Sequence, residues 1–159
     1  MPNSRIGYYV TLFKENYQGD PWLGESFEVK LKDVNNSNAF HRPGKDIHSI
    51  GEIVAHIIYW RDSLLKHLEG DRGYKGSVKN SDNWPSPEQL EKEGWASLHK
   101  RLETSQKKIV SLLAKQPDSF LSEEYSAGAS YAYLIQGIID HDIYHLGQIG
   151  LVKKMLSVI

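Results

Sequence analysis

Four stretches of the chain carry apolar residues at the three-to-four-residue spacing of an amphipathic helix. No stretch shows the strict alternation of apolar and polar residues that a half-buried strand requires. We therefore predict an all-α four-helix bundle. Its helices are expected near residues 5–18, 49–69, 86–115 and 130–157.

Two of these helices have a clear N-terminal signal. Ser49-Ile50-Gly51-Glu52 reads as a capping box, in which the serine oxygen accepts from an unpaired backbone N–H and the glutamate reaches back to the cap. Ser86-Pro87-Glu88-Gln89 repeats the pattern, with proline at the first helical position. Gly70 is expected to end the second helix.

The connections between the helices differ greatly in length. Residues 20–47 are irregular, with a helical turn expected only around Phe27–Leu31, so they form a long first crossover. Residues 71–85 are expected to be a polar loop. At 159 residues, with no internal repeat, we expect residues 1–159 to be a single domain.

Composition excludes several classes of function. The chain has no cysteine, which rules out disulfides, thiolate metal ligands and cysteine nucleophiles. A formal net charge of -1, without a basic stripe, argues against a nucleic acid partner. No apolar run approaches the ~18 residues of a membrane span, and the N-terminus lacks the apolar run of a signal peptide. We expect a cytoplasmic protein that acts on a small molecule, with no membrane partner.

The last predicted helix holds the most informative sequence, His141-Asp142-Ile143-Tyr144-His145. Its two histidines, four residues apart, lie on one face with Cβ atoms about 6 Å apart, so both imidazoles can reach one cation. On a helical wheel His145 falls inside the apolar stripe, His141 about 40° off it, and Asp142 on the inward half. Ionisable groups in a core cost several kcal/mol unless they are paired or bound to metal.

A third histidine, His56, lies at the edge of the apolar stripe of the second helix. Together with His141 and His145 it would supply three neutral imidazoles and leave coordination positions open. Zinc, nickel or iron suits such ligands better than calcium or magnesium. We expect the binding of such an ion to weaken below about pH 6, where imidazoles protonate.

Other interpretations of these residues stay open. An inward histidine is most often a hydrogen-bonded core residue, and a pair spaced four apart also arises by chance. His141-Asp142-x-x-His145 is close to the HExxH pattern of zinc proteases, but no histidine follows it. A di-iron carboxylate site would need two Glu-x-x-His motifs and two more glutamates. Glu52 can support His56, although its capping role already explains it. The remaining histidines are expected at the surface or in loops: residues 41, 48, 67 and 99.

Three sequence segments resemble the DinB-like (YfiT-like) family of four-helix-bundle metalloproteins. The segments occur in the same order as in the family, and the resemblance extends over nearly the whole chain. They are Gly19-Asp20-Pro21-Trp22-Leu23-Gly24, the stretch from His48 to Trp60, and the stretch from Ile138 to Ile149. The last is the most specific. The resemblance implies that His56, His141 and His145 are the metal ligands, and that the bundle has a long first crossover.

The resemblance also implies a metal-dependent enzyme, because members of known activity resemble thiol S-transferases that join a low-molecular-weight thiol to an electrophile. A divalent ion on three neutral histidines can activate a thiol or water near neutral pH. Without cysteine in the chain, the thiol must be a cosubstrate. The alternatives are a non-enzymatic metal-binding or dimerising bundle and, with less support, a metal-dependent hydrolase.

Secondary roles near the metal are expected for two residues. Gln148, one turn beyond His145, can hydrogen-bond a bound water or substrate, and Asp142 is the other candidate to support the ligands. Tyr144 turns away from the apolar stripe and is expected to pack or to form an interface. We also expect a homodimer.

Overall fold

The computed structural model describes residues 4–157. Its framework is four long helices, so the predicted all-α four-helix bundle is confirmed. These helices are α1 (Arg5–Gln18), α3 (Ile50–Leu68), α5 (Trp95–Leu113) and α6 (Tyr131–Ser157). The short helix α2 (Phe27–Leu31) lies where a helical turn was expected, inside the long first crossover.

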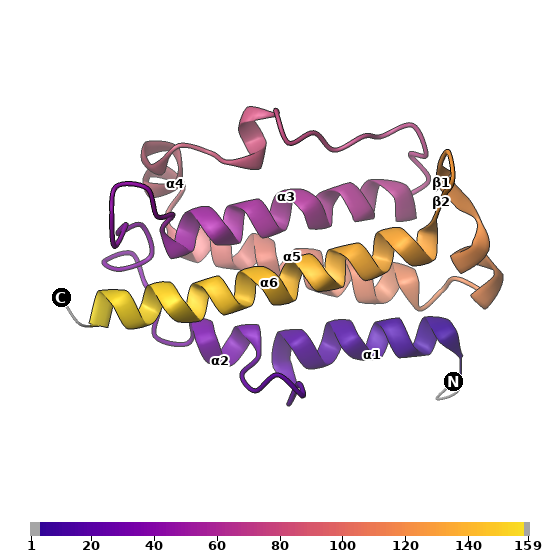
Figure 1. Ribbon diagram of the computed structural model, residues 1–159, viewed down its shortest axis with the longest axis horizontal. Coiled ribbons are helices and arrows are strands. Elements are labelled where there is room, and N and C mark those ends of the chain that lie inside the picture. Colours follow the sequence, from indigo (N-terminus) through magenta and orange to yellow (C-terminus); the bar gives the residue numbers. More distant parts are fainter. Residues whose placement is uncertain (1–3, 158–159) are drawn as a thin grey trace.

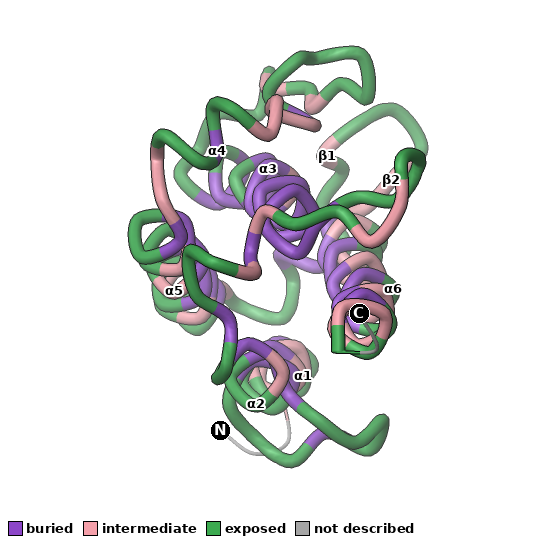
Figure 2. The backbone as a smooth tube through the Cα atoms, turned by 90° about the vertical axis from the view of Figure 1, so that its left-hand side faces the viewer, coloured by how far each residue is buried: buried purple, intermediate pink, exposed green. Residues whose placement is uncertain are grey.

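Each long helix packs against two others. Helix α3 contacts α5 and α6, and α1 contacts the same two helices from the opposite side. Figure 2, viewed along the bundle, accordingly shows α1 across from α3 and α5 across from α6. Helices α3 and α5 run in the same direction, because residues 70–86 return along the outside of α3 before α5 begins (Figure 1). This second long connection covers the side of α3 that faces away from α1.

The third predicted helix, 86–115, is wrong as one unbroken element. It is divided into α4 (Pro87–Glu93) and α5 at Gly94, whose φ of 82° lies in the left-handed region that favours glycine. The backbone N–H of Trp95 then donates to Asn36 Oδ1 at 2.7 Å, so a side chain of the first crossover caps the new helix.

Short elements fill the remaining connections. A 3₁₀ turn, η1 (Ser81–Asn83), lies within the return segment, and a second, η2 (Asp118–Ser122), follows α5. Contrary to the expectation of no strands, a small antiparallel hairpin joins β1 (Glu124–Ser126) to β2 (Ala129–Ser130) ahead of α6. These strands are too short to show a periodicity in the sequence.

Both predicted capping boxes are present. Ser49 and Glu52 cap α3 reciprocally, and Ser86 and Gln89 do the same for α4. Glu52 is 1% exposed and also accepts hydrogen bonds from the side chains of Arg42 and His48. Burial by itself would raise the pKa of Glu52, but the hydrogen bonds from Arg42, Ser49 and His48 outweigh it and lower the pKa to about 2.

This carboxylate is expected to stabilise the fold in a pH-dependent way. Its pKa is about 2 in the folded chain and 4.5 ordinarily. The contribution is therefore complete above pH 4.5 and is lost as the pH falls toward 2. We expect Glu52→Gln to lower the free energy of unfolding at pH 7 by about 1–3 kcal/mol. Urea denaturation at several pH values measures this, with Glu124→Gln on the exposed hairpin as the control. A deficit that stays constant between pH 7 and pH 2.5 would contradict the assignment.

Candidate metal centre

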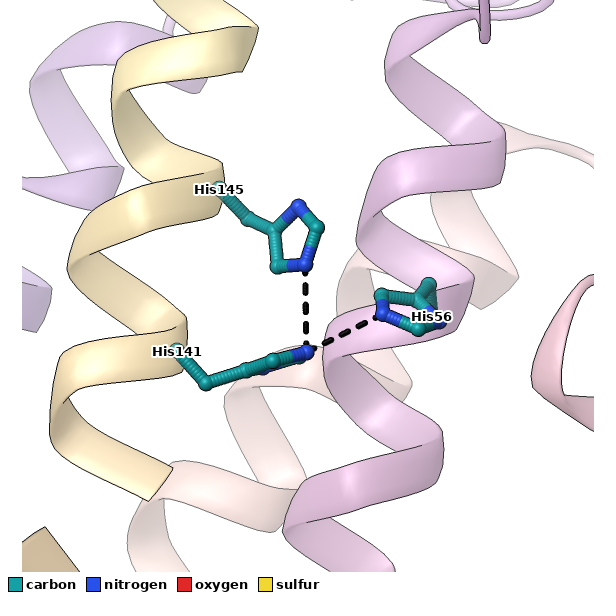
Figure 3. A group of neighbouring side chains, drawn as sticks. All are labelled: His56, His141 and His145. Atoms are coloured by element: carbon teal, nitrogen blue, oxygen red, sulfur yellow. Dashed lines mark hydrogen bonds between the residues drawn. The ribbon is translucent and has the colours of Figure 1, made fainter. Parts of the chain in front are cut away.

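His56 on α3 and His141 and His145 on α6 point toward one another across the interface of the two helices (Figure 3). The Nε2 atom of His141 lies 3.0 Å from Nε2 of His56 and 3.1 Å from Nε2 of His145. His56 and His145 are 7% and 5% exposed, and His141 is half-buried. The helical wheel thus ranked the burial of the two α6 histidines correctly. The structure brings together all three histidines that the sequence singled out.

The second nitrogen of two rings is held by a hydrogen-bond acceptor. Nδ1 of His56 lies 3.0 Å from the carbonyl oxygen of Asn83, and Nδ1 of His145 lies 2.6 Å from Oε1 of Gln148. Both acceptors require a proton on Nδ1. In a neutral imidazole this leaves Nε2 with a free lone pair, and both of these lone pairs face His141.

His141 alone cannot satisfy the two lone pairs. Its neutral ring carries one proton, so it can donate from Nε2 to His56 or to His145 but not to both. Its own Nδ1 is buried and has no hydrogen-bond partner among residues 4–157. Nitrogen lone pairs held about 3 Å apart repel one another, and a cation among them removes that repulsion.

The electrostatic environment keeps the three rings neutral. Burial lowers the pKa of His56 and of His145. It lowers the pKa of His141 further, to about 3, and the neighbouring His145 and His56 and the Arg61 guanidinium add to the shift. Only a neutral imidazole binds metal. Because these three rings resist protonation, their nitrogens stay available to a metal ion.

The geometry fits a transition-metal ion. Three nitrogens at about 2.1 Å from one ion stand roughly 3.0–3.4 Å apart for octahedral to tetrahedral angles. The two Nε2 separations of 3.0 and 3.1 Å fall within that range. Within the described residues no carboxylate or fourth histidine joins this group.

Aromatic side chains surround the three histidines. Trp84 stacks on His56 with ring centroids 3.9 Å apart, and Trp60 meets His141 edge-on at 6.2 Å. Tyr144, 64% exposed as its outward direction predicted, meets His145 at 4.9 Å. Asn83 and Trp84 belong to the return segment that was expected to be an ordinary polar loop. A tryptophan within that polar stretch was the one signal that could have indicated their role.

Of the histidines expected at the surface or in loops, His67 is buried, whereas His48 is exposed in a loop as expected but contacts an aromatic ring. His67 is 5% exposed and packs edge-on against Tyr125 and Tyr131, so that expectation is wrong for it. His67 lies in the last turn of α3, where Tyr125 of the hairpin covers it. His48 is exposed but stacks on Trp84, 3.9 Å between centroids.

The two candidates for supporting roles differ in their partners. Gln148 contacts His145 through Nδ1 of its ring rather than reaching across the site. Asp142 is 1% exposed, as its inward position predicted, but its partner is Arg61 of α3, whose Nε donates to Oδ2 at 3.0 Å. Glu52 is occupied by the cap, Arg42 and His48.

Comparison with known sequences agrees with this geometry. Within the described residues, no helix combines the length and apolar character that crossing a membrane requires. Neither a curated protein nor a solved structure matches the chain. The sequence model of the DinB superfamily matches residues 25–149, which include all three histidines of the cluster. With most of its length matched, in a helical bundle that holds a histidine cluster compatible with metal binding, the chain belongs to the DinB superfamily.

Proposed function

We propose that the protein binds one divalent metal ion through His56, His141 and His145 and uses it to react a low-molecular-weight thiol with a small electrophile. One observation carries the metal site: three Nε2 atoms converge while the Nδ1 protons of His56 and His145 are held elsewhere. The family resemblance supports the thiol-transfer chemistry. Zinc and nickel are the first candidates for the ion, and iron is the third.

A divalent ion on three neutral ligands keeps its full positive charge, so when bound it favours the thiolate form of a thiol and polarises an electrophile. The chain's own residues hold the ligands. The Asn83 carbonyl and Gln148 keep the proton on Nδ1 of His56 and of His145, and Trp84 holds the plane of the His56 ring. Because the chain has no cysteine, the thiol must come from a cosubstrate.

Access is expected from the side of His141, the most exposed of the three ligands. The other two rings are covered, His56 by Trp84 and His145 by Gln148 and Tyr144. Reactants entering beside His141 would meet the edge of Trp60 as well.

A second candidate function is a non-enzymatic bundle that the metal stabilises. The aromatic rings of Trp60, Trp84 and Tyr144 around the histidines favour it, because they would hinder an exogenous ligand. A homodimer is proposed for either function. The outward face of α6 supports this proposal, since it exposes Tyr133, Tyr144 and Leu151.

Cobalt substitution separates the two functions. We expect the cobalt-loaded protein to develop an intense near-ultraviolet charge-transfer band when a low-molecular-weight thiol is added, because the thiolate reaches the ion directly. The control is His141→Ala treated with the same cobalt and thiol, in which the band is lost. Conjugation of a model electrophile such as chlorodinitrobenzene is measured on the same samples.

A metal-loaded protein that shows neither a new band nor conjugation with any thiol would favour the structural bundle. Metal binding itself is tested separately, by stoichiometry and affinity, so the two parts of the proposal fail independently.

A further inference from the structure

The core of the bundle contains a fully buried arginine that no part of the proposed chemistry uses. Arg61 is 0% exposed and lies five residues after His56 on α3, about 7.5 Å farther along the helix. Its partner Asp142 directly follows His141 on α6 and is 1% exposed. Nε and Nη2 of Arg61 lie 3.0 and 2.9 Å from the same carboxylate oxygen, Oδ2.

The guanidinium of Arg61 also contacts the other helices. Nη1 donates to Oγ of Ser105 on α5 at 3.4 Å. The Arg61 Cζ atom lies 5.4 Å from the centroid of the Phe27 ring on α2 and 6.0 Å from that of Tyr17 on α1. One side chain thus joins α1, α2, α5 and α6 to α3 at the level just beyond the histidines.

Stability does not explain why the core keeps this ion pair. The desolvation of two buried charges offsets most of their attraction, and well-packed apolar residues of similar volume are often as stable or more so. The pair is also imperfectly satisfied, because Asp142 Oδ1 has no hydrogen-bond partner among residues 4–157. A role in specifying geometry is the better-supported reason for such a pair.

The interface of α3 and α6 needs something to set its register. Within residues 4–157, the side-chain hydrogen bonds between these helices are those of His56 with His141 and of Arg61 with Asp142. The other contacts between these helices are packing contacts, among them the edge-on ring pairs of Trp60 with His141 and of His67 with Tyr131, and they fix a register less strictly than hydrogen bonds do. A slide of one residue moves a helix about 1.5 Å, whereas metal–ligand distances tolerate about 0.2 Å.

We propose that Arg61 and Asp142 are positioning residues that set the register of α6 against α3, so that His141 and His145 meet His56 at one ion. The inference rests on the proposed metal site. The two charges cancel, so replacing both leaves the net charge near the histidines unchanged.

The test uses the double variant R61M/D142L, which fills the same space without a directional contact. We expect it to stay folded while its cobalt affinity falls about 10–100-fold and its visible d–d spectrum changes, as when groups that orient metal ligands are removed. The control is Leu113→Ala, which destabilises a fully buried position at the far end of α5 and should keep the wild-type cobalt affinity. A folded double variant with wild-type affinity and spectrum overturns the proposal.

A metal-free measurement keeps this inference separate from the proposed function. The chain has no cysteine, so spin labels attach only at K66C on α3 and K154C on α6, two exposed positions that are not among the residues named for the dimer face. We expect the label–label distance distribution of the metal-free protein to shift or broaden in the R61M/D142L background, and an unchanged distribution overturns the proposal. Failure of the wild type to bind cobalt would refute the metal site and leave this measurement valid.

If R61M/D142L does not fold, R61K takes its place in both measurements. Lysine keeps the charge but not the planar fork that reaches Asp142 and Ser105 together. Cobalt affinity and label distances equal to the wild type in R61K would then overturn the proposal.

Discussion

Replacing His141 with alanine is expected to lower the affinity for zinc or cobalt by about 100-fold or more. Free energies of about 10–16 kcal/mol for four-ligand zinc sites correspond to roughly 3 kcal/mol per ligand, and 1.4 kcal/mol is a factor of ten. Among the three histidines, His141 is the one within hydrogen-bonding distance of both others. Competition with a chromogenic chelator measures the affinity on protein purified without an affinity tag.

The matched control is His41→Ala, which removes an exposed histidine outside the cluster. Added metal should raise the unfolding temperature of the wild type and of this control by mass action, and should leave His141→Ala nearly unchanged. Equal metal stoichiometry and affinity in all three proteins would refute the three-histidine site.

The same titration tests the pH dependence. Burial lowers the pKa of all three histidines, so protons compete with the metal only at a lower pH than for free imidazole. The sequence predicts that metal binding weakens below about pH 6. With these lowered pKa values, the weakening of metal binding should begin at a lower pH. In the metal-free protein, by contrast, stability should fall as the pH drops below 6.5, because the unfolded chain takes up these protons first.

Replacing Arg61 alone with methionine is expected to lower the free energy of unfolding by about 3–5 kcal/mol, because it leaves the Asp142 carboxylate buried without a partner. For a chain of this length that corresponds to a fall in the unfolding temperature of roughly 6–20 °C. Thermal and urea denaturation of the metal-free protein measure the loss.

Arg72→Met is the matched control, since it removes an arginine whose ion pair with Glu123 is exposed. Such pairs contribute about 0–1 kcal/mol, so this variant should be nearly as stable as the wild type. Adding Asp142→Leu to Arg61→Met should recover most of the lost stability. A single Arg61 variant as stable as the Arg72 variant would mean that the buried charge is not costly.

Local sequence patterns predicted the parts of the fold that local physics decides. The capping boxes at Ser49 and Ser86 could be predicted from the sequence, because a helix cap is formed by residues within one turn of each other. Gly94 shows the limit of that reasoning. Apolar spacing continues on both sides of it, and the break is completed by Asn36, which lies 59 residues before Trp95 in the sequence.

For the candidate site, too, local sequence patterns predicted some features and missed others. The spacing of His141 and His145 places both rings on one face of α6, and His56 was identified from its position at the edge of an apolar stripe. The hydrogen-bond acceptor for His56 could not be predicted in this way. It is the backbone carbonyl of Asn83, and a carbonyl carries no residue-specific signal in a sequence.

The sequence by itself thus determined four amphipathic helices, three candidate ligands and the absence of a thiol, because periodicity, residue chemistry and composition are local properties. Only the tertiary structure decided which groups surround those ligands. Trp84 covers His56 because residues 70–86 return along α3, and Asp142 pairs with Arg61 rather than with a histidine because α6 packs against α3 at this register. Contacts between distant segments depend on how helices pack, which is a property of the assembled core.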